Sequence, residues 1–423
     1  MSPILHTLAQ LNRGELKGVV RLQLSENLTT FPEAIFDLAD SLEILDLSNN
    51  KLSVIPDDLS RLKKLRILFC SNNRFTELPE VLGGCQQLEM IGFKSNQIIR
   101  VSSAALPSLT RWLILTDNRI EQLPEDIGRL ERIQKLALAG NRLTSLPDSI
   151  KNCHKLELIR LSANRLYAFP DVLLSLPRLA WLAFSGNPFC VERDSHDEFK
   201  TVQFGDLALH QVLGQGASGV ISLATWQRNT FDFPDKVAVK VFKGEVTSDG
   251  YPEDELDACL AVGSHNNLVK PLAKVVDQDC SALVMELIPS HYTNLGQPPS
   301  LESCTRDTFL AGLQFSLEKI AYIVEQVDRL VLHFCDKKVS HGDLYAHNIL
   351  ISEEGHVLFG DFGAASKYGN LSMDQQQGIE QIERRALGFF IDDMLSLCTE
   401  EDKVNELYPS LKSRCLSSIT PKQ

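Results

Sequence analysis

The sequence predicts an α/β solenoid followed by an α+β domain of two lobes. The first half repeats with a fixed period, which is typical of a solenoid. The second half has a glycine-rich turn between two apolar segments and, further on, acidic motifs on predicted loops. We place the solenoid at residues 1–190, a short connector or cap at 191–203, and the second domain at 204–423.

The repeats of the first half share one frame of apolar residues and an asparagine. Leu42, Leu45, Leu47, Asn50 and Leu52 define it, and the asparagine recurs 23 residues apart in all but one of its steps. The frame resembles the leucine-rich repeat family over about residues 19–190, in about eight repeats. The resemblance implies inward leucines, and asparagines that bond backbone groups of each turn.

A column of apolar residues lies between the inward leucines. Side chains alternate along a strand, so this column is expected on the concave surface of the solenoid. We expect an exposed stripe there that binds a protein partner or substrate, or the second domain of this chain; scattered surface residues are the alternative. The predicted partner surface consists of Ile67, Phe69, Met90, Trp112, Ile114, Leu158 and Trp181.

A glycine-rich hairpin is predicted at the start of the second domain. The segment 207–213 reads as a strand, Gly214-Gln215-Gly216-Ala217-Ser218-Gly219 follows, and 220–224 reads as a second strand. Alone, such a motif is weak. Followed by a strand and not by a helix, it fits a hairpin whose backbone N–H groups cover the phosphates of ATP.

Further residues are predicted to complete the ATP site. Lys240, at the end of an apolar strand, can neutralise the phosphates, and Glu255 in a helical stretch can pair with it, although Glu253 competes for that role. The strand 283–287 is expected to lead into a hinge that meets the adenine. The residues expected to bind ATP are Gly214, Gln215, Gly216, Ala217, Ser218, Gly219, Ile221, Ala238, Lys240, Met285, Glu286 and Ile288.

Two loop motifs carry the predicted chemistry. In the segment His341-Gly342-Asp343-Leu344-Tyr345-Ala346-His347-Asn348, Asp343 can orient and deprotonate an acceptor hydroxyl. Asn348, and Asp361 of Asp361-Phe362-Gly363, can bind Mg²⁺ through oxygen atoms.

In this order, the motifs resemble the protein-kinase superfamily over about residues 204–398, and more narrowly the leucine-rich-repeat kinases of plants and bacteria. The resemblance implies transfer of phosphate from ATP to Ser, Thr or Tyr hydroxyls, and we expect Ser or Thr rather than Tyr. It also implies a catalytic set, which consists of Lys240, Glu255, Asp343, Asn348 and Asp361.

The sequence departs from that family in three ways. Gly342 stands where an arginine is usual, Tyr345 where Ser/Thr kinases have lysine, and no Ala-Pro-Glu follows Asp361. Glu383 lies in a predicted central helix, and the large lobe is expected to be abbreviated. Two alternatives therefore stay open: a small-molecule phosphotransferase, similar to aminoglycoside and choline kinases, or a weakly active or inactive pseudokinase scaffold.

Composition limits the class of partner and the cellular compartment that we expect for the protein. The net charge of −13 argues against nucleic acid as the main partner. No stretch approaches the roughly 18 apolar residues that a membrane span needs, and residues 1–10 do not read as a signal peptide. The ten cysteines are scattered, which favours a reducing compartment. We therefore expect a cytoplasmic protein.

Overall fold

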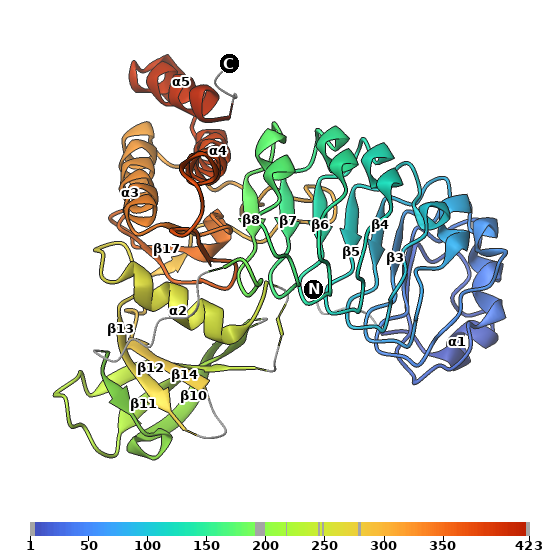
Figure 1. The fold of residues 1–423 in the computed structure, drawn as a ribbon, viewed down its shortest axis with the longest axis horizontal. Coiled ribbons are helices and arrows are strands. Elements are labelled where there is room, and N and C mark those ends of the chain that lie inside the picture. Colours follow the sequence, from blue (N-terminus) through green and yellow to red (C-terminus); the bar gives the residue numbers. More distant parts are fainter. Residues whose placement is uncertain are drawn as a thin grey trace. The chain divides into compact units, whose positions relative to one another are not determined.

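The chain divides into two compact units. The computed structural model describes residues 5–190, 199–216, 218–243, 246–247, 249–277 and 281–419. The first unit comprises Met1–Leu179 with Asn187–Phe189, and the second Ala180–Gly186 with Cys190–Gln423 (Figure 1). Ala217 and most of the predicted connector, residues 191–198, lie outside the described residues.

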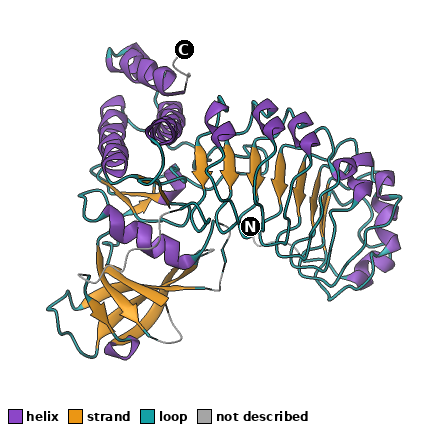
Figure 2. Cartoon of the chain, viewed as in Figure 1, coloured by secondary structure: helices purple, strands orange, loops and turns teal. Residues whose placement is uncertain are grey.

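The first unit is built from short parallel strands, each followed by a one-turn helix, as Figure 2 shows. The short helix α1 (Leu8–Asn12) precedes them. The strands are β1 (Arg21–Gln23), β2 (Ile44–Asp46), β3 (Ile67–Phe69), β4 (Met90–Gly92), β5 (Trp112–Ile114), β6 (Lys135–Ala137) and β7 (Leu158–Arg160), and each pairs with the next. Strand β8 (Trp181–Ala183) continues the repeat pattern but lies in the segment that belongs to the second unit. The 3-10 helices are η1 (Glu33–Leu38), η2 (Leu59–Arg61), η3 (Glu80–Gly84), η4 (Ser103–Ala105), η5 (Glu125–Arg129), η6 (Asp148–Asn152) and η7 (Asp171–Ser175). The predicted solenoid of repeats is confirmed.

The repeated asparagines tie neighbouring repeats together. The amide nitrogen of Asn96 donates to the carbonyl oxygens of Cys70, 3.0 Å away, and Phe93, 3.2 Å away. Its side-chain oxygen accepts from the backbone N–H of Phe75 at 3.1 Å. These bonds satisfy backbone groups that the repeat buries, which explains why an asparagine recurs with the period of the repeat.

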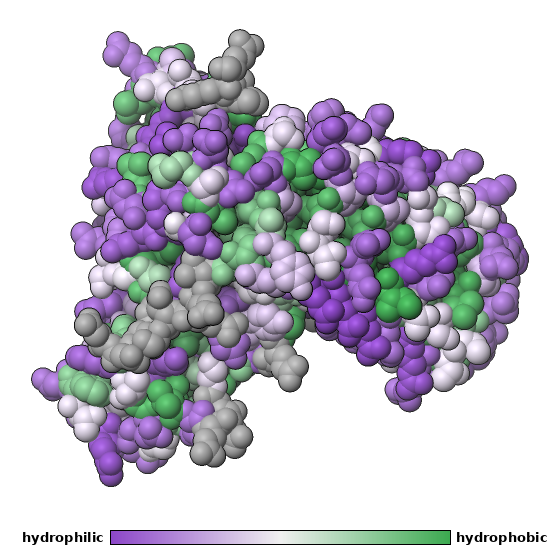
Figure 3. Space-filling view, viewed as in Figure 1, coloured by the Kyte–Doolittle hydropathy of each residue, from purple (hydrophilic) through white to green (hydrophobic). Residues whose placement is uncertain are grey.

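Four of the seven residues of the predicted partner surface are buried, and one of them, Trp181, is buried against Leu344 and Tyr345, which fits the alternative that the surface binds the second domain. Ile67, Met90, Leu158 and Trp181 are at most 5% exposed, whereas Phe69, Trp112 and Ile114 are half-buried. The parallel register sets Ile67 beside Met90 and Met90 beside Trp112, and strands about 4.8 Å apart let such large side chains cover one another. On the face that Figure 3 draws, hydrophilic side chains interrupt the apolar patches of the first unit.

The small lobe of the second unit is one six-stranded sheet with a helix. Its strands are β9 (Thr201–Val202), β10 (Leu207–Gln215), β11 (Gly219–Trp226), β12 (Lys236–Phe242), β13 (Pro271–Val276) and β14 (Ser281–Glu286), in the order β10-β11-β12-β14-β13-β9. Helix α2 (Pro252–Val262) begins with proline and three acidic residues, both of which favour a helix N-terminus. The 3-10 turn η8 (Phe204–Asp206) precedes β10.

The large lobe is mainly helical. Its helices are α3 (Leu317–Asp336), α4 (Met373–Ser396) and α5 (Leu407–Ile419), with the 3-10 turns η9 (Ala346–Asn348) and η10 (Asp402–Val404). Strands β15 (Thr293–Asn294), β17 (Ile349–Ile351) and β18 (Val357–Phe359) form one small sheet, and β16 (Val339–Ser340) pairs with β19 (Ser366–Lys367). A capping box of Ser372 and Gln375 starts α4 soon after β19. The predicted two-lobed α+β domain is confirmed.

Across the described residues, helices with both the length and the apolar character needed to cross a bilayer are absent.

We expect Asn96→Ala to destabilise the repeats by about 1–3 kcal/mol, because it leaves buried backbone groups without a partner. Urea unfolding of the full chain, followed by circular dichroism, measures the change. Asn152→Ala is the control, since Asn152 is exposed at the end of η6. Equal stability of the two variants would contradict a structural role for the repeated asparagines.

Candidate active site

A cleft of about 730 Å³ in the second unit brings most of the predicted ATP-site residues together. Its walls come from the glycine-rich hairpin, from β12, from the end of β14 and the segment after it, and from the large lobe. The predicted residues that line it are Gly214, Ile221, Ala238, Lys240, Met285, Glu286, Ile288, Asn348 and Asp361. Gln215, Gly216, Ser218 and Gly219 belong to the hairpin but not to this lining.

The glycine-rich segment forms the predicted hairpin between β10 and β11. Gln215 pairs with Val220, and the backbone N–H of Gly216 donates to the carbonyl of Gly219 at 3.0 Å. A Cβ atom on Gly219 would lie 2.5 Å from the carbonyl oxygen of Val241, so this position accepts only glycine without a shift of β12. Gly214 and Gly216 face open space, which leaves room for a ligand beside the backbone.

An ion pair joins β12 to α2 at the cleft. Lys240 pairs with Glu255, and both side chains are less than a tenth exposed. The Lys240 ammonium also lies 3.9 Å from the carboxylate of Asp361. Glu253 is exposed, so the structure selects Glu255 from the two predicted candidates. A lysine between two carboxylates is a fixed positive charge beside the cleft.

Burial and charge oppose each other at this pair. Burial alone lowers the pKa of Lys240, but the charges of Glu255 and Asp361 outweigh it and leave the pKa above its ordinary value. Burial raises the pKa of Glu255, against the opposing effect of Lys240. The lysine is therefore protonated at neutral pH and available to an anion.

The loop that carries Asp343 is fixed by a carboxylate from α4. Glu383, which is 1% exposed, accepts hydrogen bonds from the Ser340 hydroxyl at 2.7 Å and from the backbone N–H groups of His341 and Gly342 at 3.2 and 3.1 Å. On the other side of Asp343, the amide of Asn348 donates to the Asp343 carboxylate at 2.8 Å. The structure thus brings together Asp343 and Asn348, two of the predicted site residues.

His341 connects this loop to the Asp361 motif. Its ring lies 4.3 Å from the ring of Phe359 and 5.3 Å from that of Phe362, measured between centroids. Both phenylalanines are about as buried as His341 itself. Because these rings pack together, the segment that carries Asp343 and the segment that carries Asp361 share one core.

An ion pair at His347 was not predicted from the sequence. The Nδ1 atom of His347 lies 2.6 Å from the carboxylate of Asp307, which also accepts from the His347 backbone N–H at 3.2 Å. Burial alone lowers the pKa of His347, but the hydrogen bond and charge of Asp307 leave it raised. Asp307 lies in a loop with no motif around it, so no local signal could have indicated this pair.

The oxygen atoms at the cleft are of the kind that binds a hard divalent cation, for which phosphate oxygens of a nucleotide would be further ligands. Asn348 and Asp361 both line the cleft, and carboxylate and amide oxygens suit Mg²⁺. Within the described ranges, no group of three or more His, Cys, Asp and Glu residues is placed to hold a metal ion.

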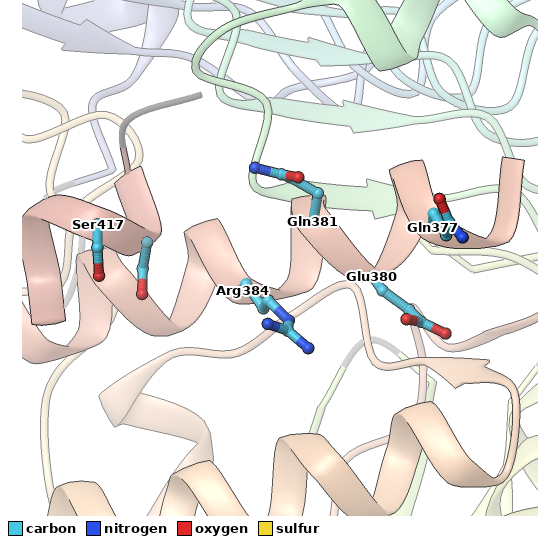
Figure 4. Close-up of a pocket in the computed structure, with 6 residues that line it drawn as sticks. Gln377, Glu380, Gln381, Arg384 and Ser417 are labelled. Carbon is cyan, nitrogen blue, oxygen red and sulfur yellow. The ribbon is translucent and has the colours of Figure 1, made fainter. Parts of the chain in front are cut away.

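A second, smaller hollow of about 370 Å³ lies between α4 and α5. Figure 4 shows Gln377, Glu380, Gln381 and Arg384 on α4 and Ser417 on α5 around it. Glu380 pairs there with Lys338 at 2.8 Å. None of the predicted site residues lines this hollow.

Comparisons with known proteins match both halves of the chain. Residues 207–386 match the family model described as protein tyrosine and serine/threonine kinase. The leucine rich repeat model matches residues 17–75, 40–98, 108–166 and 131–189.

Individual relatives match smaller parts. Fibroblast growth factor receptor 1 of Xenopus laevis is 26% identical over 168 residues, which cover 38% of this chain and 21% of the relative. The receptor of the same name from Pleurodeles waltl is 25% identical with the same coverage. The chain thus spans about a fifth of the length of these relatives. A solved leucine-rich-repeat protein of Leptospira interrogans is 27% identical, with a TM-score of 0.36, over 42% of this chain and 52% of that one.

We expect Asp307→Asn to lower the pKa of His347, because the variant loses the hydrogen bond and charge of Asp307 that raise it, while burial still lowers it. In the parent the folded-state pKa is raised above 6.5, so the pair stabilises the fold fully below that pH and less as the pH rises through the raised value. An NMR titration of the His347 ring measures this, with exposed Asp336→Asn as the control. An unchanged titration in Asp307→Asn would contradict the assignment.

Proposed function

We propose that this chain, which combines leucine-rich repeats with a protein-kinase domain, is an active ATP-dependent protein kinase that phosphorylates Ser or Thr hydroxyls. The observation that carries the proposal is one cleft lined by Lys240, Asn348 and Asp361, with Asp343 bonded to Asn348 at its edge. A positive charge, two oxygen ligands and a base are the parts that phosphoryl transfer needs.

The residues take separate roles in this proposal. The hairpin Gly214–Gly219 covers the phosphates, and the chain from Met285 to Ile288 receives the adenine. Lys240, held by Glu255, binds phosphate oxygens. Asn348 and Asp361 would hold Mg²⁺, which would neutralise charge on the phosphates.

Asp343 acts on the acceptor. Its carboxylate orients the hydroxyl and takes its proton as the hydroxyl oxygen forms a bond to the γ-phosphorus. The bond from that phosphorus to the bridging oxygen breaks, and ADP leaves. The bond from Asn348 keeps the carboxylate in place while the acceptor binds, which lowers the entropic part of the barrier.

The repeats are proposed to recruit the protein partner or substrate in the cytoplasm. The half-buried residues Phe69, Trp112 and Ile114 are the part of the predicted partner surface that is accessible to a partner. Repeat solenoids commonly bind through such extended surfaces.

One observation favours a second candidate function. Helix α4 begins at Met373, close behind Asp361, so little chain is left between them to contact a peptide. A small-molecule phosphotransferase, with a small alcohol as acceptor, would need less protein surface to bind its acceptor.

We expect Asp343→Asn to lower kcat for transfer at least about 100-fold, the usual contribution of a positioned base. The affinity for ATP should change little, because Asp343 does not line the cleft. Transfer from γ-labelled ATP to a generic protein acceptor measures the rate, with Asp336→Asn as the matched control. A folded parent that binds ATP without turning it over would instead indicate a scaffold, and turnover without label on protein would indicate a small acceptor.

A further inference from the structure

The segment Ala180–Gly186 belongs to the second unit, although its sequence continues the repeat pattern of the first half. It contains strand β8. Its side chains are fully packed: Trp181 is 1% exposed, and Leu182 and Phe184 are 0% exposed. Trp181 was predicted to lie on a surface that binds a partner or the second domain of this chain, and inside this unit it contacts the loop that carries Asp343.

Trp181 contacts the two residues that follow Asp343. Its indole N–H donates to the carbonyl oxygen of Leu344 at 3.1 Å. Its ring stacks on that of Tyr345, with centroids 4.5 Å apart and planes 10° apart. It also stacks on Phe389 of α4, with ring centroids 5.4 Å apart. The tryptophan therefore fixes Leu344 and Tyr345 against the central helix.

Two further contacts join the same segment to the neighbourhood of Asp343. The Ser366 hydroxyl accepts from the backbone N–H groups of Phe184 and Ser185 at 2.9 and 3.1 Å. Gly342 has φ +69°, and a Cβ atom there would lie 2.5 Å from the carbonyl oxygen of Leu182. Glycine at this position thus permits the close approach of β8, and a larger residue would displace one of the two.

The residues that precede and follow Asp343 in the sequence are therefore both held in place. Glu383 fixes the three residues before it, and Trp181 fixes the two after it. Removing either support frees one end of the short segment that sets the direction of the carboxylate.

We propose that Trp181 is a positioning residue of the kinase, which acts on catalysis through Leu344 and Tyr345. The proposal rests on the proposed function. It assigns to residues 180–186 a part of the catalytic domain, in addition to their place in the repeat pattern.

The first test is Trp181→Phe in the full chain. Phenylalanine keeps an aromatic ring beside Tyr345 and Phe389 but removes the N–H that bonds Leu344. We expect kcat for phosphoryl transfer to fall about 10-fold to 100-fold, as for a displaced reacting group. The KM for ATP should stay within about twofold, because Trp181 does not line the cleft. Trp181→Leu, which also loses the stack, should lower kcat further.

Trp226→Phe is the matched control. Trp226 also donates from its indole N–H to a backbone carbonyl, that of Pro234 at 3.0 Å, and stacks on Phe233 at 5.4 Å. It lies on β11, outside the cleft lining. The same chemical change there should leave kcat within about twofold of the parent.

Hydrogen exchange of residues 341–348 tests the positioning without relying on activity. In Trp181→Phe these amides should exchange at least about fivefold faster than in Trp226→Phe, while α3 keeps its protection. If the parent transfers no phosphate but this difference is seen, the proposed function fails and the support of the loop by Trp181 stands. Equal exchange in the two variants, or an equal loss of kcat in both, would overturn the inference.

Discussion

The buried carboxylate of Glu383 is the interaction on which the site depends most. Three donors from consecutive residues converge on it, from Ser340 to Gly342. A buried carboxylate is costly unless such donors satisfy it, so the loop and helix α4 have to fold together. Asp343 directly follows these residues, so the direction of its carboxylate depends on the position of α4. The packing inside the large lobe therefore affects the geometry of the proposed catalytic base.

The nucleotide side of the cleft is organised by a second buried charge pair. Lys240 on β12 and Glu255 on α2 bind each other, and Asp361 approaches the same ammonium from the large lobe. His341 packs on Phe362, and so couples the two acidic loops. The fold thereby links the small-lobe sheet, the central helix and the two loops through a few buried polar and aromatic contacts.

Local patterns in the sequence predicted much of this, and long-range contacts explain what they missed. The asparagine period predicted the solenoid because each repeat meets only its neighbours. The hairpin, Lys240, Asp343, Asn348 and Asp361 were predictable from motifs on short segments. Asp307 and the role of Trp181 were not, because each depends on a partner far away in the chain. The burial of Ile67, Met90 and Leu158 was not predicted, because alternation along a strand sets the direction of a side chain but not what covers it.

The loop that carries Asp343 is held by Glu383 and Trp181, and it has Gly342 where an arginine that could bind a phosphate is usual. We therefore expect that the loop needs no phosphorylation to take its position, and this can be tested directly. We would treat the purified protein with a phosphatase, remove the phosphatase, and follow label transfer from γ-labelled ATP to a protein acceptor from the first seconds. We expect transfer at once, at the rate of untreated protein. A lag that disappears after preincubation with ATP would contradict it, since the loop would then depend on a phosphate for its position.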